Sequence, residues 1–319
     1  YLDEYYQQYI SQFPRAQGME EAQFQTALKQ WEKTFSKGLD QLGKRLWTFL
    51  PKSFQDEYFK IYLSGDAPRS IIVHSDEMVF PWELVVPHST INGKLIILEP
   101  LGISHVFGRW KTSLPMKPIP QNLQVRNFCV LNPTYTAPHE LPWSLVEIKA
   151  LQRLFPKLLV IKPADLTAVE TQILNRSDIQ IFHFSGHGRY DQNNSDLSEL
   201  LLEGNGALKA LGFIGTKLCA EACPIVYLNA CSVGSTGLVV GRMGGFAANF
   251  LENGCSGVIA PYWPINDARA AKFSVSLYKK LQTGRAIGEA LQELRSENRT
   301  DPTFIAYSYF GDPWTRLNL

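Results

Sequence analysis

Two stretches of the sequence decide the fold: IQIFHFSGHGR, from Ile179 to Arg189, and PIVYLNACSVG, from Pro224 to Gly234. Each is an apolar run of strand length that ends in small residues suited to a sharp turn. The first run places His187 between two glycines, and the second places Cys231 at its end. Loops at the carboxyl ends of neighbouring strands in an open α/β sheet face one crevice, where such sheets bind ligands. We therefore expect His187 and Cys231 to meet there as a base and a nucleophile.

Composition excludes several function classes. The chain has 319 residues, of which 45% are hydrophobic and 19% charged, and its formal net charge is +1. These values are typical of an ordinary globular protein. The near-neutral balance, without a tract rich in lysine and arginine, gives no indication of nucleic-acid binding. No apolar run approaches the ~20 residues that a transmembrane helix requires. We expect no direct contact with nucleic acid or membrane.

The five cysteines indicate free thiols. Their number is odd, and they stand at positions 129, 219, 223, 231 and 255 without the spacing of a disulfide framework. Cys219 and Cys223 are four positions apart, but no second pair of ligands stands at zinc-site distance. The pattern predicts a reducing, cytoplasmic location and no bound metal. Because the chain begins with Tyr1 and not with Met, we expect it to be a piece of a longer protein.

Residues 1–68 are predicted to form a helical appendage to the main domain. One apolar stripe recurs at helical spacing: Phe24, Leu28, Trp31, Phe35, Leu39 and Leu42. Pro51 begins a second, shorter helix. A stripe of this kind favours a packed core face over a ligand site. We interpret the region as the end of a larger upstream module, such as a sensor.

Shorter extended segments follow in residues 69–112. We predict strands over 70–74, 78–85 and 94–99, with a hairpin turn at Asn92-Gly93. The proline-rich sequence from Leu114 to Pro120 predicts a linker over residues 113–122.

Residues 123–319 alternate between strand and helix patterns and are predicted to form the main domain. The predicted strands cover 125–133, 158–162, 179–186, 224–231, 256–263 and 304–310. The predicted helices cover 141–155, 166–175, 244–254, 267–282 and 285–297. Repeated strand–helix units predict a doubly wound α/β fold, with a mostly parallel sheet and helices on both faces.

The glycine beside His187 supports the same chemistry. A tetrahedral oxyanion needs backbone N–H donors close by, and a residue without a side chain lets substrate approach them. We expect the oxyanion hole to consist of the backbone N–H groups of Gly188 and Cys231. The bland interpretation is an inert thiol at a strand end and a tight turn at SGHG. His183, inside the strand, is an alternative base, although a buried core histidine explains it more simply. The other histidines, at positions 74, 88, 105 and 139, receive no role.

These residues carry a family resemblance. HFSGHG followed by LNACSVG resembles the CHAT family, caspase-like cysteine peptidases of the caspase–separase–gingipain clan. Further segments resemble other parts of that family's pattern: FPWELV (80–85), GVIAPYWPIND (257–267), GEALQELR (288–295) and FGDP (310–313). His187 precedes Cys231 by 44 positions, near the ~50 of caspases. Asn229 replaces the glutamine of the caspase motif, and this departure argues against caspase-type cleavage after aspartate.

The resemblance implies a function and a mechanism. It implies a caspase-like fold, with Cys231 as the nucleophile and His187 as the general base and acid of an endopeptidase. The sequence nominates no third residue to orient His187, and the chemistry requires neither a metal nor an organic cofactor. The resemblance further implies a regulated prokaryotic effector in a defence or signalling system, a class that includes CRISPR-linked and gasdermin-linked systems. Such an effector acts on a protein substrate under an upstream sensor or partner protein.

Substrate selection has a weaker basis. By resemblance, Asp267 stands where separases carry an acidic residue that recognises arginine. Trp263 and Tyr262 could pack against the aliphatic part of such a side chain. This predicts cleavage after a basic residue. Asp267 also precedes a predicted helix, so an N-cap is the competing interpretation. Asp191 and Asp196 are rival acids in a polar loop.

Two other function classes remain open. One is a catalytically silent caspase-like scaffold that binds partners. The other is a thiol hydrolase or acyltransferase that acts on a non-peptide ester. Labelling of Cys231 by an electrophilic peptide distinguishes the first from a peptidase, and turnover of small activated esters without protein cleavage would indicate the second.

Overall fold

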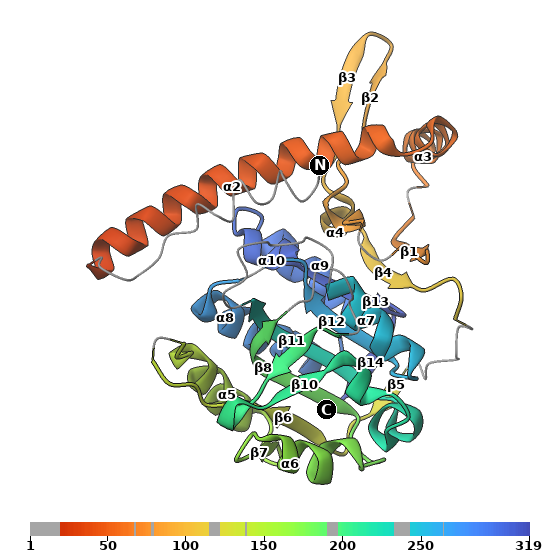
Figure 1. Ribbon diagram of the computed structural model, residues 1–319. Coiled ribbons are helices and arrows are strands. Elements are labelled where there is room, and N and C mark those ends of the chain that lie inside the picture. Colours follow the sequence, from red (N-terminus) through yellow and green to blue (C-terminus); the bar gives the residue numbers. More distant parts are fainter. Residues whose placement is uncertain are drawn as a thin grey trace.

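The computed structural model describes residues 20–66, 68–77, 80–114, 122–137, 139–189, 197–232, 243–263 and 265–319, without the side chains of residues 21, 231, 232 and 243–246. Their centre is a ten-stranded sheet (Figure 1). Its main path runs β1 (Ser70–His74), β4 (Val106–Trp110), β13 (Tyr307–Gly311), β12 (Gly257–Pro261), β11 (Ile225–Ser232), β8 (Ile181–Arg189), β6 (Phe128–Leu131) and β7 (Leu159–Ile161). Neighbours on this path are parallel except β12 and β13, so the sheet is mostly parallel, as predicted.

Helices cover both faces of the sheet, as the strand–helix alternation predicts. One face packs against α5 (Pro142–Leu154), α8 (Asp267–Gln282) and α9 (Ile287–Glu297). The other packs against α6 (Leu166–Val169), the π-helical turn of residues 170–174 and α7 (Met243–Glu252). Alternation along β8 divides its side chains between these two cores: Ile181 joins the first, and Phe182 and Phe184 join the second. The doubly wound arrangement is therefore confirmed.

A short antiparallel extension lies beside the end of β8. Strand β9 (Glu199–Leu201) pairs with the last residues of β8, and β10 (Ala207–Lys209) pairs with β9. A separate two-stranded parallel sheet joins β5 (Asn122–Gln124) to β14 (Arg316–Asn318). Asn122, the last residue of the predicted linker, is thus part of a strand, while residues 115–121 lie outside the described part of the chain.

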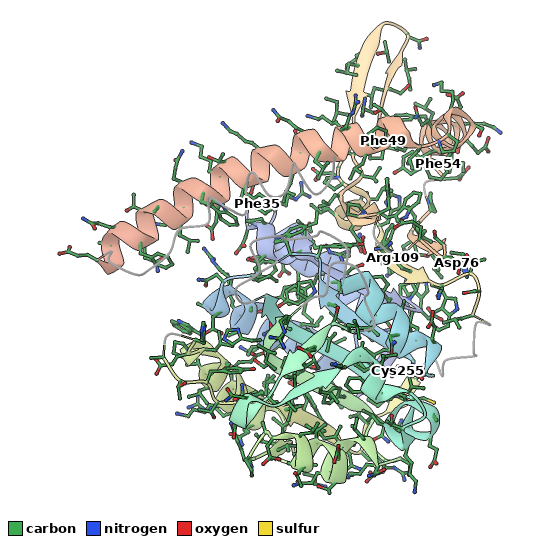
Figure 2. The ribbon with its side chains drawn as sticks, in the orientation of Figure 1. Phe35, Phe49, Phe54, Asp76, Arg109 and Cys255 are labelled. Atoms are coloured by element: carbon green, nitrogen blue, oxygen red, sulfur yellow. The ribbon has the colours of Figure 1, made fainter. Side chains whose placement is uncertain are left out.

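The amino-terminal helices form a distinct layer. Helix α2 (Glu21–Phe49) lies across one end of the body and leads into α3 (Lys52–Ser64) (Figure 1). The predicted stripe supplies its buried face, and Figure 2 shows Phe35 on the side of α2 that faces the body. The Phe35 ring packs edge-on against Trp263 at 5.6 Å, and Glu32 forms a 2.9 Å ion pair with Arg269. The helix predicted before residue 20 lies outside the described residues.

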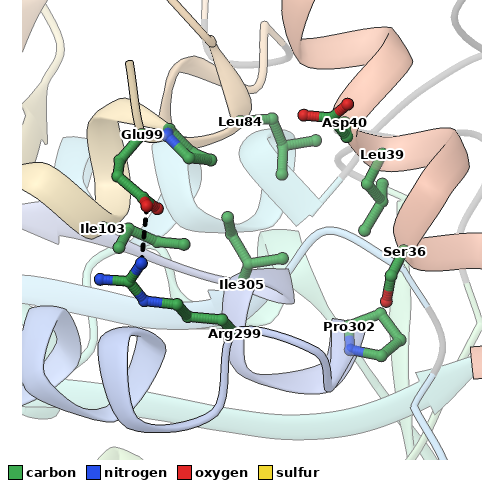
Figure 3. A pocket seen from close by; sticks show the side chains of 10 residues that line it. Ser36, Leu39, Asp40, Leu84, Glu99, Ile103, Arg299, Pro302 and Ile305 are labelled. Carbon is green, nitrogen blue, oxygen red and sulfur yellow. Dashed lines mark hydrogen bonds and ion pairs between the residues drawn. The ribbon is translucent and has the colours of Figure 1, made fainter. Parts of the chain in front are cut away.

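A small cavity of about 190 Å³ remains at the junction between α2 and the body. An ion pair between Glu99 and Arg299, 2.6 Å long, lies on one side of this cavity (Figure 3). Asp40 of α2 also lines the cavity. Among the described helices, none combines the length and the apolar character of a membrane-spanning segment.

The predicted hairpin turn is present, but its first strand is not the predicted one. Asn92 and Gly93 both have positive φ, 51° and 75°, and join β2 (His88–Ile91) to β3 (Lys94–Ile97). The strand predicted over 78–85 is wrong, because residues 82–84 form a 3₁₀ turn. Pro81 has no N–H for a strand ladder, and the Val85 N–H donates back to Trp82.

Two further elements differ from expectation. The predicted strand 304–310 begins late, because α10 (Pro302–Ala306) precedes β13. Asp301 caps this helix by accepting from the Thr303 N–H at 3.0 Å, and Pro302 occupies the first turn. Strand β4 was not predicted, and it follows a short helix, α4 (Leu101–Ser104).

Candidate active site

The backbone register places the predicted dyad together. Strands β8 and β11 are parallel neighbours, and Cys231 is the register partner of His187 at their carboxyl ends. Ser232 and Gly188 form the next pair along. The side chain of Cys231 lies outside the described part of the structure. Two residues 44 positions apart in sequence are therefore direct neighbours in the sheet.

A main-chain carbonyl orients His187. Its Nε2 atom lies 2.7 Å from the carbonyl oxygen of His139, in the loop between β6 and α5. A carbonyl oxygen only accepts, so Nε2 carries the hydrogen, and in the neutral ring Nδ1 keeps its lone pair. The side chain is 6% exposed. The sequence nominated no orienting residue, and the acceptor supplied by His139 is independent of that residue's side chain.

The Tyr135 side chain also contacts the end of β8 that carries His187. Its hydroxyl accepts from the backbone N–H of His187 at 2.9 Å and donates to the Leu201 carbonyl at 2.8 Å. The two rings are 4.4 Å apart. A Cβ on Gly186 would lie 2.5 Å from the Tyr135 hydroxyl, so this contact requires glycine there. Burial raises the pKa of Tyr135, which keeps the phenol protonated as a donor.

A cleft opens beside His187. Its volume is about 470 Å³, and it lies between the 135–139 loop and the β9–β10 extension. Its lining includes Tyr135, His139 and His187, together with Leu201, Asn205 and Ala207. Arg189 also lines it and forms an ion pair with Glu199 of β9. A partly enclosed, partly apolar cleft next to His187 is a suitable place for a peptide side chain.

Gly188, one of the two predicted oxyanion donors, is flanked on both sides by other strands. Its register partners are Ser232 in β11 and Leu200 in β9. The predicted pairing of its N–H with that of Cys231 stays a prediction.

His183, the alternative base, is fully buried. Its ring stacks on Tyr227 at 4.5 Å and 11°, and Nδ1 lies 3.1 Å from the Tyr278 hydroxyl. Nε2 is 3.2 Å from a carboxylate oxygen of Glu147. These contacts place His183 in the polar interior beneath the dyad.

Asp267 contacts a helix end, but not the end of its own helix. Asn266 caps α8, with its side chain accepting from the Arg269 N–H at 3.3 Å. The Asp267 carboxylate instead accepts from the Trp143 N–H, in the first turn of α5, at 2.8 Å. Burial raises the pKa of Asp267 to about 6, against the lowering effect of this hydrogen bond. Trp143 stands four positions after His139, whose carbonyl oxygen contacts His187.

Trp263 is 3% exposed. It packs between Phe35 of α2 and the ring of Tyr262, whose hydroxyl donates to Glu83 at 3.1 Å. In this conformation neither aromatic ring presents surface for a substrate side chain. The rival acids Asp191 and Asp196 lie outside the described residues.

Three groups around the site were not among the residues predicted from the sequence: the Tyr135 hydroxyl, the His139 carbonyl and Glu147. For Glu147 a signal existed, since it interrupts the apolar stripe of α5 at a position that is buried together with Ser144, Ile148 and Leu151. Within the described part of the chain, no group of three or more metal-ligating side chains could hold a metal ion.

Fold and site together define a doubly wound α/β domain with a histidine and a cysteine paired at neighbouring strand ends. The chain matches the CHAT domain over residues 80–309 and belongs to the CHAT domain family. This confirms the predicted family, and the mostly parallel sheet with helices on both faces confirms the predicted fold class. No curated protein sequence gives a significant match.

Two solved structures give matches to the chain. One is Saccharomyces cerevisiae separase in complex with securin, at 15% identity and a TM-score of 0.42, covering 73% of this chain and 14% of the separase chain. The other contains the pro- and mature domains of Porphyromonas gingivalis RgpB, at 10% identity and a TM-score of 0.49, covering 88% of this chain and 69% of the other. The chain therefore spans about a seventh of the length of the separase that it matches.

Proposed function

We propose that this chain is a cysteine endopeptidase in which Cys231 is the nucleophile and His187 the general base and acid. The register pairing of these two residues at the ends of β8 and β11 is the observation that carries the proposal. The contact of His187 Nε2 with the His139 carbonyl supports it, because this hydrogen bond leaves Nδ1 as the proton acceptor.

In the proposed mechanism, Nδ1 of His187 takes the proton of the Cys231 thiol. The thiolate attacks the scissile carbonyl carbon, and the backbone N–H groups of Gly188 and Cys231 donate to the oxyanion. His187 then gives the proton to the leaving amine, because an amide anion is a very poor leaving group. Water hydrolyses the resulting thioester, with His187 again as the base.

The test is mass spectrometry of a peptide library incubated with wild type, Cys231→Ala and His187→Ala. We expect both single variants to lose cleavage while remaining folded, and the double variant to be no worse than either. Cleavage by folded Cys231→Ala at the wild-type rate would contradict the dyad. Turnover of small activated esters without peptide cleavage would favour a thiol hydrolase, and failure of Cys231 to react with electrophilic peptides would favour a silent scaffold.

We further infer that Asp267 selects a basic residue before the scissile bond. Support comes from its position beside the first turn of α5 and from its partial burial, which strengthens a charge-assisted pair with arginine. Asparagine separates this role from that of a structural cap, because its side-chain oxygen can still accept from the Trp143 N–H. Asp267→Asn should lower kcat/KM for arginine substrates by at least ~10²-fold and leave alkylation of Cys231 unchanged. An unaltered basic preference in Asp267→Asn would exclude the role.

Control through the amino-terminal helices is the remaining part of the proposal. Helix α2 holds the segment after β12 through Phe35 on Trp263 and Glu32 on Arg269. A sensor or partner that moves α2 would uncover Trp263 for the substrate's side chain, as expected for a regulated cytoplasmic effector in a prokaryotic defence system. Phe35→Ala should then raise the basal cleavage rate. A rate that stays at the wild-type level in folded Phe35→Ala, while a partner still activates the chain, would exclude this route.

A further inference from the structure

A buried carboxylate lies beneath the dyad on the face of the sheet covered by α5 and α8. Glu147, on α5, is 1% exposed. One of its oxygens accepts from the Ser185 hydroxyl at 2.7 Å. Its oxygens also accept from the Asn229 side-chain amide at 3.1 and 3.2 Å, and from the Ser274 hydroxyl of α8.

Two of these donors belong to the strands that carry the dyad. Ser185 is two residues before His187 on β8, and Asn229 is two residues before Cys231 on β11. Ser185 and Asn229 are themselves register partners. Because side chains alternate along a strand, positions two apart belong to one face. Glu147 therefore joins the two strands one pleat below the paired dyad positions.

The donors around Glu147 are fixed by further contacts. The Tyr307 hydroxyl donates to the side-chain oxygen of Asn229 at 2.8 Å, which directs the amide N–H₂ toward Glu147. The Asn132 side chain donates to the Ser185 carbonyl at 2.9 Å. In the described part of the chain, the one ion-pair partner of Glu147 is His183, which is charged only when protonated.

We propose that Glu147 is a positioning residue for the dyad, which sets the separation and register of the β8 and β11 ends through Ser185 and Asn229. This rests on the proposed function of Cys231 and His187. Hydrogen bonds to a carboxylate are stronger than those between neutral groups, so Glu147 opposes displacement of Ser185 and Asn229. A nucleophile and base misplaced by a fraction of an ångström react much more slowly, because attack requires near-contact geometry.

A matched pair of serine substitutions tests the inference. Ser185 and Ser274 are both buried, and both donate a hydroxyl to Glu147, but only Ser185 belongs to a dyad strand. Ser185→Ala should lower kcat about tenfold with KM unchanged, and Ser274→Ala should change kcat less than about twofold. Glu147→Gln should lower kcat about 100-fold, because glutamine presents one acceptor oxygen where the carboxylate presents two.

The rate of iodoacetamide alkylation of Cys231, measured by peptide mapping in the same variants, is a second measurement that needs no substrate. It should fall in Glu147→Gln and Ser185→Ala and stay at the wild-type value in Ser274→Ala. Equal kcat in the two serine variants, or wild-type kcat in Glu147→Gln, would overturn the inference. Cys231→Ala is measured alongside: if it retains peptide cleavage, the proposed dyad fails, and if only the Glu147 variants behave as wild type, the positioning role alone fails.

Discussion

Two buried carboxylates, Glu147 on α5 and Glu83 in the 3₁₀ turn of residues 82–84, have different charge environments. Glu147 is surrounded by neutral donors and one histidine. Glu83 is fully buried and accepts from the hydroxyls of Ser308 and Tyr262. It also lies close enough to two fully buried arginines, Arg109 and Arg295, to affect both of them electrostatically.

The difference separates a cluster that stabilises the fold from one that we propose positions the dyad. Burial lowers the pKa of Arg109 and of Arg295, and the Glu83 charge opposes that effect. Arg295 also donates to the carbonyls of Gly102 and Tyr307 at 3.0 and 2.6 Å, which fixes α9 against α4 and β13. Glu83 thus compensates buried positive charge, whereas Glu147 holds negative charge beneath the dyad strands without an arginine or lysine partner in the described ion pairs.

The largest expected effect on stability is at Glu83. Glu83→Ala leaves two buried guanidinium groups without their carboxylate, so we expect a loss of about 3–5 kcal/mol in the free energy of unfolding. Urea denaturation measures it. In the remaining folded protein, alkylation of Cys231 should proceed at the wild-type rate. A loss below ~1 kcal/mol would contradict the claim that Glu83 compensates the charge of the two buried arginines.

At Glu147 the stability effect should be smaller and the kinetic effect larger. Glu147→Gln keeps the volume and part of the hydrogen bonding, and no buried cation is left uncompensated. We expect it to lower the free energy of unfolding by about 1–3 kcal/mol. The same urea titration, run beside Glu83→Ala, ranks the two. A loss at Glu147 that exceeds the loss at Glu83 would reverse the comparison.

The titration of Asp267 should make the stability of the folded protein depend on pH. Its folded-state pKa of about 6 exceeds the ordinary value of 3.8, so the folded state binds the proton more tightly. The resulting stabilisation is complete below about pH 4 and is lost as the pH rises through about 6. Relative to Asp267→Asn, wild type should therefore lose stability across that window and run parallel outside it. The charge of Glu147 contributes to the raised pKa of Asp267. Glu147→Gln should therefore bring that pKa closer to 3.8 and narrow the pH range over which stability is lost. Melting temperatures from pH 4 to pH 7 test both statements, and a flat difference would contradict them.

The smallest effect should come from the exposed ion pair of Glu99 and Arg299, beside the cavity in Figure 3. Both side chains are about half exposed, at 48% and 51%. Glu99→Ala should cost less than ~1 kcal/mol, and added salt should reduce that cost further. A loss comparable to that of Glu83→Ala would mean that the α2 junction is more tightly coupled than its exposure indicates.

The positions of most strands along the chain, and the register pairing of His187 with Cys231, could be predicted because they depend on local patterns. The apolar runs ending at His187 and Cys231, the stripe of α2 and the Asn92-Gly93 turn each have a period or a turn chemistry visible in the sequence. The segment 82–84 misled this reasoning, because Glu83 lies within an apolar run yet is buried by partners far away in the sequence. Its burial depends on tertiary contacts that no local pattern encodes.

The support around the dyad was harder to predict for the same reason. The acceptor for His187 is a main-chain carbonyl, which every residue type possesses, so His139 carries no sequence signature for this role. Tyr135 acts through one hydroxyl that bridges β8 and β9, a contact set by the loop path. Only Glu147, a charged residue in a buried helical stripe, was visible in principle.

The central claim is that Cys231 and His187 act as a pair. Its most direct test is the rate of Cys231 alkylation by iodoacetamide at pH 6.5, a pH at which an ordinary thiol is almost fully protonated, in wild type and in His187→Ala. Peptide mapping separates Cys231 from Cys223, which is partly exposed. The account predicts that wild type reacts at least ~10-fold faster than His187→Ala, because the imidazole takes up the thiol proton. Equal rates in the two folded proteins would contradict it.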